Sequence, residues 1–289
     1  MFDQSTEPLS RRRMLQLTVA GAATAVTPRV IRAEGEKDPY AGFKMGMQSY
    51  SLRAYDTPTA LRHTRALGLM YWESFPKHIP LTTLPKGIAD SKALLKESGV
   101  TLMGYGVIDF DANETNARQK FDFAKAMGIP ALSANPKKDK ATFDLLDKLV
   151  AEYDIPIAIH NHGPRARYSK ISDVADVVKD RHPKIGACVD TGHYLRSDES
   201  PVEALERLSS RLYGVHLKDV QTIDPNGKRK KIFTIVGQGD LDVLGCLRVL
   251  KKLKYQGCLS LEYEENEQNP LSDIAVSLAA VREAAAKLG

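Results

Sequence analysis

The feature that most constrains the fold of this chain is a regular alternation of short apolar segments and amphipathic segments, which begins at Lys44. Short apolar segments bounded by turn residues predict strands. The predicted strands are Lys44–Tyr50, Met70–Phe75, Thr101–Val107, Ala131–Ala134, Pro156–Asn161, Ile185–Asp190, Leu212–Leu217 and Cys258–Tyr263.

An amphipathic segment with helical periodicity follows each predicted strand. The predicted helices are Pro58–Leu67, Ile88–Ser98, Asn113–Met127, Ala141–Tyr153, Ile171–Lys179, Pro201–Ser209, Leu241–Leu253 and Asp273–Lys287. Alternating strands and helices indicate parallel strands, and eight such units in a chain of 289 residues predict a single-domain (β/α)8 barrel. An open doubly wound sheet is disfavoured, because no glycine-rich phosphate-binding loop follows the first strand.

The segment ahead of the barrel has the character of an export signal. Arg11 and Arg12 precede a mild apolar stretch, Leu15–Val26, in an arrangement that resembles a twin-arginine signal peptide. That stretch is too short and too rich in Thr, Ala and Gly to predict a stable membrane anchor. We therefore expect an export signal over residues 1–33, a linker over 34–43, the barrel over 44–289, and a periplasmic location. A disordered basic tail is the alternative.

The formal net charge of +5 comes mostly from residues ahead of position 40. The barrel itself is nearly neutral, which excludes nucleic acid as an expected partner. The basic run at 228–231 lies in a polar segment, Thr222–Phe233, that we expect to be a solvated loop, a lid or a subunit contact. The three cysteines, Cys188, Cys246 and Cys258, are expected to be reduced and show no metal-ligand spacing.

Polar residues end several of the predicted strands, and in a barrel these ends converge on one rim. His160, Asp190, His216 and Glu262 end four consecutive strands, the fifth to the eighth. Each alone could be a turn or a structural hydrogen-bonding residue. Together they predict a site for one divalent ion, either Mn, Co, Zn, Fe or Mg, because imidazoles and carboxylates suit such ions.

Three motifs carry a resemblance to a known family. They are Asp190-Thr191-Gly192-His193, His216-Leu217-Lys218-Asp219, and Glu262 on the last strand, and they resemble the signature of xylose isomerase-like barrels. That family includes ketose epimerases, hydroxypyruvate isomerases and inosose dehydratases. The opening segment Gly46–Arg53 is similar to the family's first strand, which implies that Gln48 and Tyr50 face the pocket.

The resemblance implies a ligand set of Glu, Asp, His and Glu, and this chain departs from it at one position. Asp190, His216 and Glu262 match, whereas His160 stands where the first Glu is expected. In the epimerases both Glu ligands also move protons. The second proton carrier here would therefore be His162, Glu73 or Lys218.

The remaining candidate residues have alternative roles. Glu262 is the expected base, and Lys218 either stabilises negative charge or pairs with Asp219. His193 either donates to a substrate hydroxyl or orients Asp190. Trp72 either forms an apolar wall for a sugar ring or packs in the core.

These features predict a metal-dependent sugar isomerase or epimerase that abstracts a proton next to a carbonyl and forms an enediolate. The first alternative is a dehydratase or lyase that acts on a keto-sugar, keto-glycoside or inosose with the same site. The second is a non-catalytic sugar-binding barrel. The expected partner is a small sugar or polyol, and a homo-oligomer is an open expectation.

Overall fold

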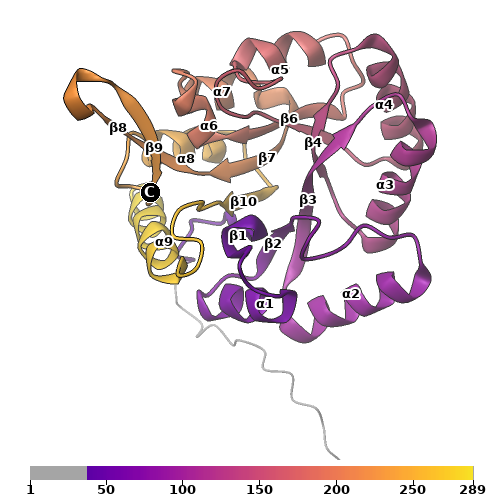
Figure 1. Ribbon diagram of the computed structural model, residues 1–289, viewed down its shortest axis with the longest axis horizontal. Coiled ribbons are helices and arrows are strands. Elements are labelled where there is room, and N and C mark those ends of the chain that lie inside the picture. The colour runs from indigo at the N-terminus through magenta and orange to yellow at the C-terminus, as the bar shows by residue number, and fades with distance from the viewer. Residues whose placement is uncertain (1–37, 289) are drawn as a thin grey trace, which may run out of the picture. The chain divides into compact units, whose positions relative to one another are not determined.

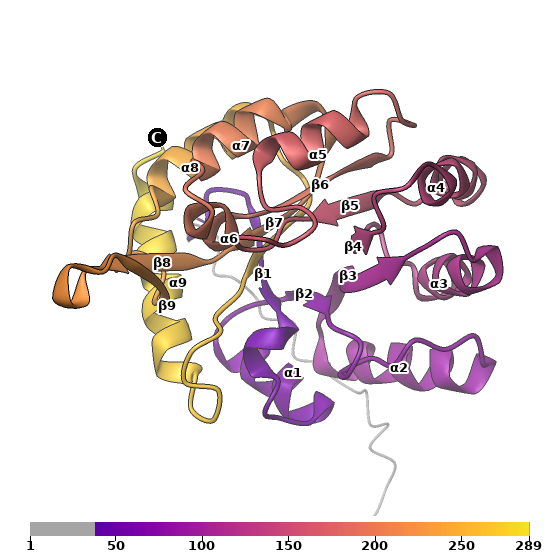
Figure 2. The ribbon, with the colours of Figure 1, turned by 45° about the horizontal axis from the view of Figure 1, so that its top comes forward.

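The computed structural model describes residues 38–288, in which eight parallel strands close into a barrel (Figures 1 and 2). Around the barrel the strand order is β1-β10-β7-β6-β5-β4-β3-β2. The strands are β1 Lys44–Gln48, β2 Tyr71–Ser74, β3 Thr101–Phe110, β4 Leu132–Pro136, β5 Ile157–His160, β6 Ile185–Asp190, β7 Leu212–Leu217 and β10 Cys258–Leu261. The predicted (β/α)8 architecture is confirmed.

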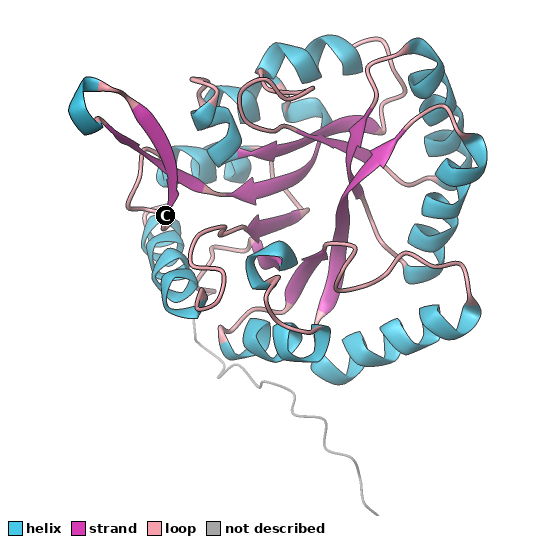
Figure 3. Cartoon of the chain, viewed as in Figure 1, coloured by secondary structure: helices cyan, strands magenta, loops and turns pink. Residues whose placement is uncertain are grey.

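Helices surround these strands on the outside (Figure 3). They are α1 Thr57–Ala66, α2 Pro85–Ser98, α3 Glu114–Met127, α4 Lys140–Tyr153, α5 Ile171–Val178, α7 Pro201–Arg207, α8 Val243–Lys252 and α9 Leu271–Ala286. Side-chain oxygens of Asp56, Asn113 and Asp139 accept backbone N–H groups at the starts of α1, α3 and α4. Gly99 and Gly128 end α2 and α3 in the left-handed conformation. No helix within residues 38–288 is both long enough and apolar enough to cross a membrane.

Two elements depart from the predicted alternation. A short helix, α6 (Thr191–Arg196), begins directly after β6, and an antiparallel hairpin follows β7. The hairpin consists of β8 (Asp219–Ile223) and β9 (Lys230–Thr234), and it projects from the barrel in Figure 1. It occupies the segment that we expected to be a loop. Short 3-10 turns complete the chain: η1 Ser49–Leu52, η2 Ser209–Arg211 and η3 Pro225–Gly227.

The packed core begins ahead of the expected domain boundary. Tyr40 and Phe43 are buried with the core residues, although both fall in the segment expected to be a linker. The expected export signal, residues 1–33, lies outside the described residues.

Asp219 organises the loop that leads from the hairpin to α8. Its buried carboxylate accepts four backbone N–H groups, those of Val220 (2.8 Å), Gly237 (3.0 Å), Gly239 (3.1 Å) and Leu241 (3.0 Å). Gly237 has a φ of +90°, and a Cβ at Gly239 would lie 2.4 Å from Asp219 Oδ1. The two glycines therefore form a tight turn around an internal carboxylate.

Replacing Asp219 with Ala is expected to lower the free energy of unfolding by about 2–4 kcal/mol, because buried amides lose their acceptor. Urea denaturation of the two proteins measures the difference. Asp224→Ala, at an exposed position of the same hairpin, should change the value by less than about 0.5 kcal/mol. A loss below about 1 kcal/mol for Asp219→Ala would show that water satisfies these amides.

Candidate active site

A cavity of about 360 Å³ opens at the carboxyl ends of the barrel strands. Most of the residues predicted to bind substrate, metal or protons line it: Gln48, Tyr50, His160, His162, His193, Lys218 and Glu262. The other lining residues are Phe75, Pro76, Gly106, Val107 and Glu264. The cavity therefore combines a polar wall with an apolar one, as small-ligand sites do.

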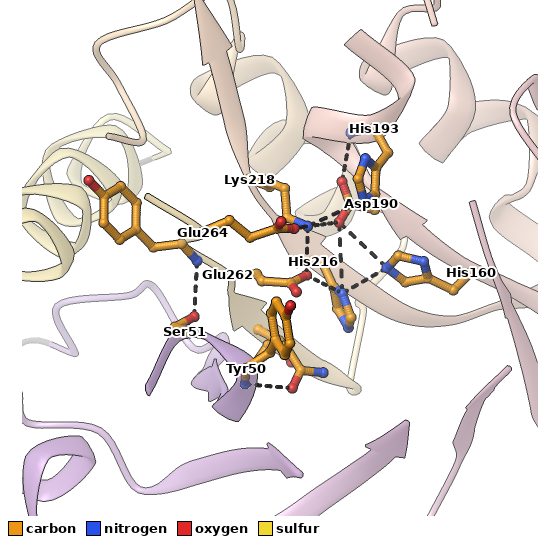
Figure 4. Close-up of polar contacts among 12 residues, drawn as sticks. Tyr50, Ser51, His160, Asp190, His193, His216, Lys218, Glu262 and Glu264 are labelled. Carbon is orange, nitrogen blue, oxygen red and sulfur yellow. Dashed lines mark hydrogen bonds and ion pairs between the residues drawn. The ribbon is translucent and has the colours of Figure 1, made fainter. Parts of the chain in front are cut away.

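The four predicted metal ligands lie together at the cavity, which His160 and Glu262 line (Figure 4). His160, Asp190, His216 and Glu262 are all buried, and their candidate ligand atoms lie within 4.8 Å of one another. Nδ1 of His216 lies 3.0 Å from Nε2 of His160 and 2.9 Å from Oε2 of Glu262. Nε2 of His160 lies 3.5 Å from Oδ2 of Asp190. Four strands thus deliver four donor atoms to one point.

The orientation of these side chains fits a divalent ion. Nε2 of His216 lies 2.9 Å from the Glu73 carboxylate, which leaves Nδ1 to face the other ligands. Asp190 Oδ1 accepts the His193 backbone N–H at 2.7 Å, whereas Oδ2 lies 3.0 Å from Lys218 Nζ and 3.5 Å from His160 Nε2. Two buried imidazoles and two buried carboxylates whose ligand atoms converge form a donor set that suits Mn²⁺, Co²⁺, Zn²⁺ or Fe²⁺.

The two ligand carboxylates are ionised at neutral pH. Burial raises the pKa of Glu262, but Lys218 and His216 outweigh it and hold the pKa well below its usual range. Burial likewise opposes ionisation of Asp190, but the charge of Lys218 outweighs it and brings the pKa of Asp190 well below its usual value. The carboxylates of Asp190 and Glu262 are therefore both negatively charged and can accept a metal ion.

Lys218 is the fixed cation of the site. Its Nζ lies 3.0 Å from Asp190 Oδ2, 3.0 Å from Glu262 Oε2 and 2.5 Å from Glu264 Oε1. Burial lowers the pKa of Lys218, but these carboxylates raise it above its ordinary value, so the ammonium stays charged. The alternative role of Lys218, an ion pair with Asp219, does not occur, because Asp219 accepts backbone N–H groups instead.

Glu264 is a site residue that the sequence reasoning missed. It lines the cavity and binds Lys218. The signal was its spacing from Glu262, since residues two apart in an extended segment share a face.

Glu73 is buried below the cavity and does not line it. Its carboxylate contacts His216 Nε2 at 2.9 Å and accepts hydrogen bonds from Ser133 Oγ at 2.6 Å and Ser260 Oγ at 3.1 Å. Burial raises the pKa of Glu73, but the contacts with His216 and Ser133 together lower it by more, so the pKa lies below its ordinary value. Its expected role as a proton carrier to substrate is therefore corrected: this carboxylate orients His216.

Trp72 also lies away from the cavity. It is fully buried in the core and stacks on His78 with ring centroids 5.5 Å apart. Trp72 therefore packs in the core, which was the alternative to a role as a wall for the sugar ring. Glu73 points into the barrel, so Trp72, its neighbour on β2, must point toward the helices. The apolar wall comes instead from Tyr50, Phe75 and Pro76, with the Tyr50 and Phe75 rings edge to face at 5.4 Å.

The hairpin reaches the site through Phe233 of β9. Its ring lies 5.6 Å from the His193 ring, and Lys218 Nζ lies 5.3 Å from its centroid. His193 lines the cavity with its ring, while its backbone N–H holds Asp190. The position of His193 is thus compatible with both expected roles, donation to a substrate hydroxyl and orientation of Asp190.

His162 supplies a neutral imidazole to the cavity wall. Burial, with a contribution from His160, lowers the pKa of His162 to about 4. An unperturbed histidine titrates near pH 6.5. At neutral pH this ring can therefore accept a proton or a hydrogen bond.

An NMR titration of the metal-free protein is expected to give His162 a midpoint well below 6.5 and near 4. Because the folded-state pKa is lowered, the contribution of His162 to stability is complete above pH 6.5 and is lost as the pH falls from 6.5 toward 4. The same ring in the urea-unfolded chain should titrate near 6.5. A folded-state midpoint at or above that value would contradict the burial argument.

Comparison with known proteins agrees with this geometry. Part of the chain is 31% identical over 140 residues to an inosose dehydratase of Clostridium botulinum, a match that covers 44% of this chain and 47% of that enzyme. An inosose dehydratase of Mesomycoplasma hyopneumoniae is 25% identical over 229 residues, which cover 63% of this chain and 76% of that enzyme. The match thus spans about half the length of the first relative.

The fold has solved counterparts as well. A xylose isomerase domain protein from Alicyclobacillus acidocaldarius superposes with a TM-score of 0.67 at 17% identity, covering 84% of this chain and 98% of that one. The model of the xylose isomerase-like TIM barrel family matches residues 61–284, which is most of the chain. On these grounds this chain belongs to the xylose isomerase-like TIM barrel family.

Proposed function

We propose that this chain is an enzyme that removes a proton from the carbon next to a carbonyl of a keto sugar or keto polyol, with one divalent metal ion. The observation that carries the proposal is the buried cluster of His160, Asp190, His216 and Glu262, of which His160 and Glu262 line the cavity. When bound there, the ion polarises a carbonyl group and stabilises the negative charge that develops beside it.

Glu262 is the base in this proposal. Its carboxylate is ionised, and the residue lines the cavity. Lys218 Nζ lies 3.0 Å from Glu262 Oε2, so the positive charge of Lys218 lies beside the proposed base. A developing oxyanion next to Glu262 would therefore meet a preorganised cation.

The substrate is proposed to be uncharged. Lys218 is the only lysine or arginine among the lining residues of the described chain, and three carboxylates already hold it. A phosphate or carboxylate on the substrate would find no free cation in this wall and would face Glu264. Free keto sugars, keto-glycosides and inososes fit this environment.

We favour elimination as the second half of the reaction, which gives a dehydratase. Glu262 would remove the proton and return it to the leaving hydroxyl, which departs as water, on one face of the substrate beside the charged Lys218 ammonium. The relatives named inosose dehydratase support this choice, although the sequence motifs alone favour an isomerase or epimerase.

Isomerisation or epimerisation remains the second candidate. His162 and Glu262 come from different strands, and both line the cavity. A neutral imidazole and a carboxylate in one cavity could exchange protons with two positions of the substrate.

Incubation of the metal-loaded protein with uncharged inososes and ketoses in heavy water tests the proposal. We expect the NMR signal of the proton beside the carbonyl to disappear. A product whose molecular formula is that of the substrate minus one water shows a dehydratase. A product with the molecular formula of the substrate, apart from exchanged deuterium, shows an isomerase or epimerase. Binding of these ligands without exchange would overturn the proposal and favour a non-catalytic sugar-binding barrel.

We also propose that the chain is exported by the twin-arginine route. The paired Arg11 and Arg12 ahead of Leu15–Val26 support it. Replacing both arginines with lysine should abolish periplasmic recovery of the protein in a host with an active twin-arginine system. Unchanged recovery would contradict this route.

A further inference from the structure

A buried cysteine lies directly below the predicted metal ligands. Cys188 is two residues before Asp190 on β6, so the two side chains share the face that points into the barrel. In the strand register Cys188 lies beside His160 of β5 and Gly214 of β7. The thiol therefore lies one layer deeper in the barrel than the Asp190 carboxylate.

The position of this thiol relative to the imidazoles is suited to coordination. Its Sγ and one nitrogen each of His160 and His216 all lie within 4.8 Å of one another. A Cβ at Gly214 would lie 2.8 Å from Sγ, so the absence of a side chain on β7 leaves the space that the thiol occupies. The thiol is free and buried. Cys188 thus extends the cluster downward from the imidazoles.

The His160 ring can serve more than one ion position. Its Nε2 faces His216, but its Nδ1 has no hydrogen-bond partner among the described residues. Metal-ligating histidines usually donate the second ring N–H to a partner that fixes the ring. Within residues 38–288 no such partner fixes His160, whereas Glu73 fixes His216.

We propose that His160, His216 and Cys188 form a second, deeper coordination position that takes a thiophilic divalent ion such as Zn²⁺ or Co²⁺. The upper position, with Asp190 and Glu262, offers two carboxylates and suits harder ions such as Mn²⁺ or Mg²⁺. Both positions use the same two imidazoles, so one ion occupies either position at a time. Cys188 thereby determines which metals the chain selects.

Coordination here involves no change of oxidation state. The S–H bond breaks, a bond from Sγ to the ion forms, and the thiol proton passes to solvent, as in other thiolate sites. The inference rests on the metal site of the proposed function, because it shares the two imidazoles. It concerns ion binding rather than turnover, so binding measurements test it.

The test is titration of the metal-free full chain with Co²⁺, followed by absorption spectroscopy. We expect about one Co²⁺ per chain and a near-ultraviolet charge-transfer band from the thiolate. Cys188→Ser should remove the band and lower the affinity for Zn²⁺ relative to Mn²⁺ by at least tenfold in a competition assay. Cys246→Ser, which removes a buried free cysteine of α8, should keep both properties.

Asp190→Asn separates the two positions, because it should weaken Mn²⁺ binding while the charge-transfer band persists. Binding of Co²⁺ to the wild-type chain without a charge-transfer band would overturn the deeper position and leave the proposed function standing. A band that persists in Cys188→Ser would also overturn it. A chain that binds no Co²⁺ would refute both proposals.

Discussion

Replacing Glu262 with Gln is expected to lower the rate of substrate proton exchange by about 10²–10⁴-fold. The reason is that the amide cannot accept the proton, although it fills the same space. Exchange should be measured by NMR in heavy water at saturating metal, because Glu262 is also a predicted ligand. Metal content determined on the same sample separates lost binding from lost chemistry.

A matched control is available three residues along the chain. Glu265 is exposed and does not line the cavity, so Glu265→Gln should retain full exchange. A loss smaller than about tenfold in Glu262→Gln would assign the base to another residue. His162 would then be the first candidate, because its neutral ring lines the same cavity.

Replacing Lys218 with Met is expected to lower the free energy of unfolding of the metal-free protein by about 3–5 kcal/mol, because buried carboxylates lose their cation. Asp190, Glu262 and Glu264 all lie within 3.0 Å of Nζ. Divalent metal should restore part of the loss, since the ion supplies positive charge to the same carboxylates. Denaturant unfolding with and without metal measures both effects.

Lys252→Met is the control for Lys218→Met, because Lys252 is exposed at the end of α8. It should change stability by less than about 0.5 kcal/mol. A loss of only that size in Lys218→Met would mean that the three carboxylates do not depend on this ammonium.

The barrel was predictable because its strands are short, apolar and separated by well-capped helices. Helix ends such as Gly99 and Gly128 carry their own local signal, as their left-handed φ angles show. The hairpin was not predictable in the same way. Its strand β9 is a basic segment with no buried residue, so it lacks the burial pattern that indicates a strand.

Alternation along a strand predicts that neighbouring residues face opposite sides, but it does not predict which of them faces the site. Trp72 and Glu73 were both expected to serve the site, yet neighbours on one strand point to opposite faces, so only one of them could. The choice depends on the register of β2 against β1, which pairs Glu73 with Gln48 and Trp72 with Met47. That register comes from the barrel as a whole.

The same alternation separates Lys218 from Asp219. As neighbours they diverge, and each finds its partners in segments distant in sequence: carboxylates on β6 and after β10 for Lys218, and the turn before α8 for Asp219. The spacing from Glu262 indicated the face on which Glu264 lies, but not its partner, a lysine 46 residues away. Long-range partners of this kind cannot be inferred from spacing alone.

The most direct test of the account is the metal content of the purified protein and of its Asp190→Ala variant, determined by plasma mass spectrometry. The account predicts about one Mn, Co, Zn or Fe ion per wild-type chain. A Mn or Fe ion should be lost in the variant, because Asp190 is buried among the other candidate ligands, whereas a Zn or Co ion held by Cys188 should remain. A wild-type chain that holds no divalent metal, even after these ions are supplied during expression, would contradict it.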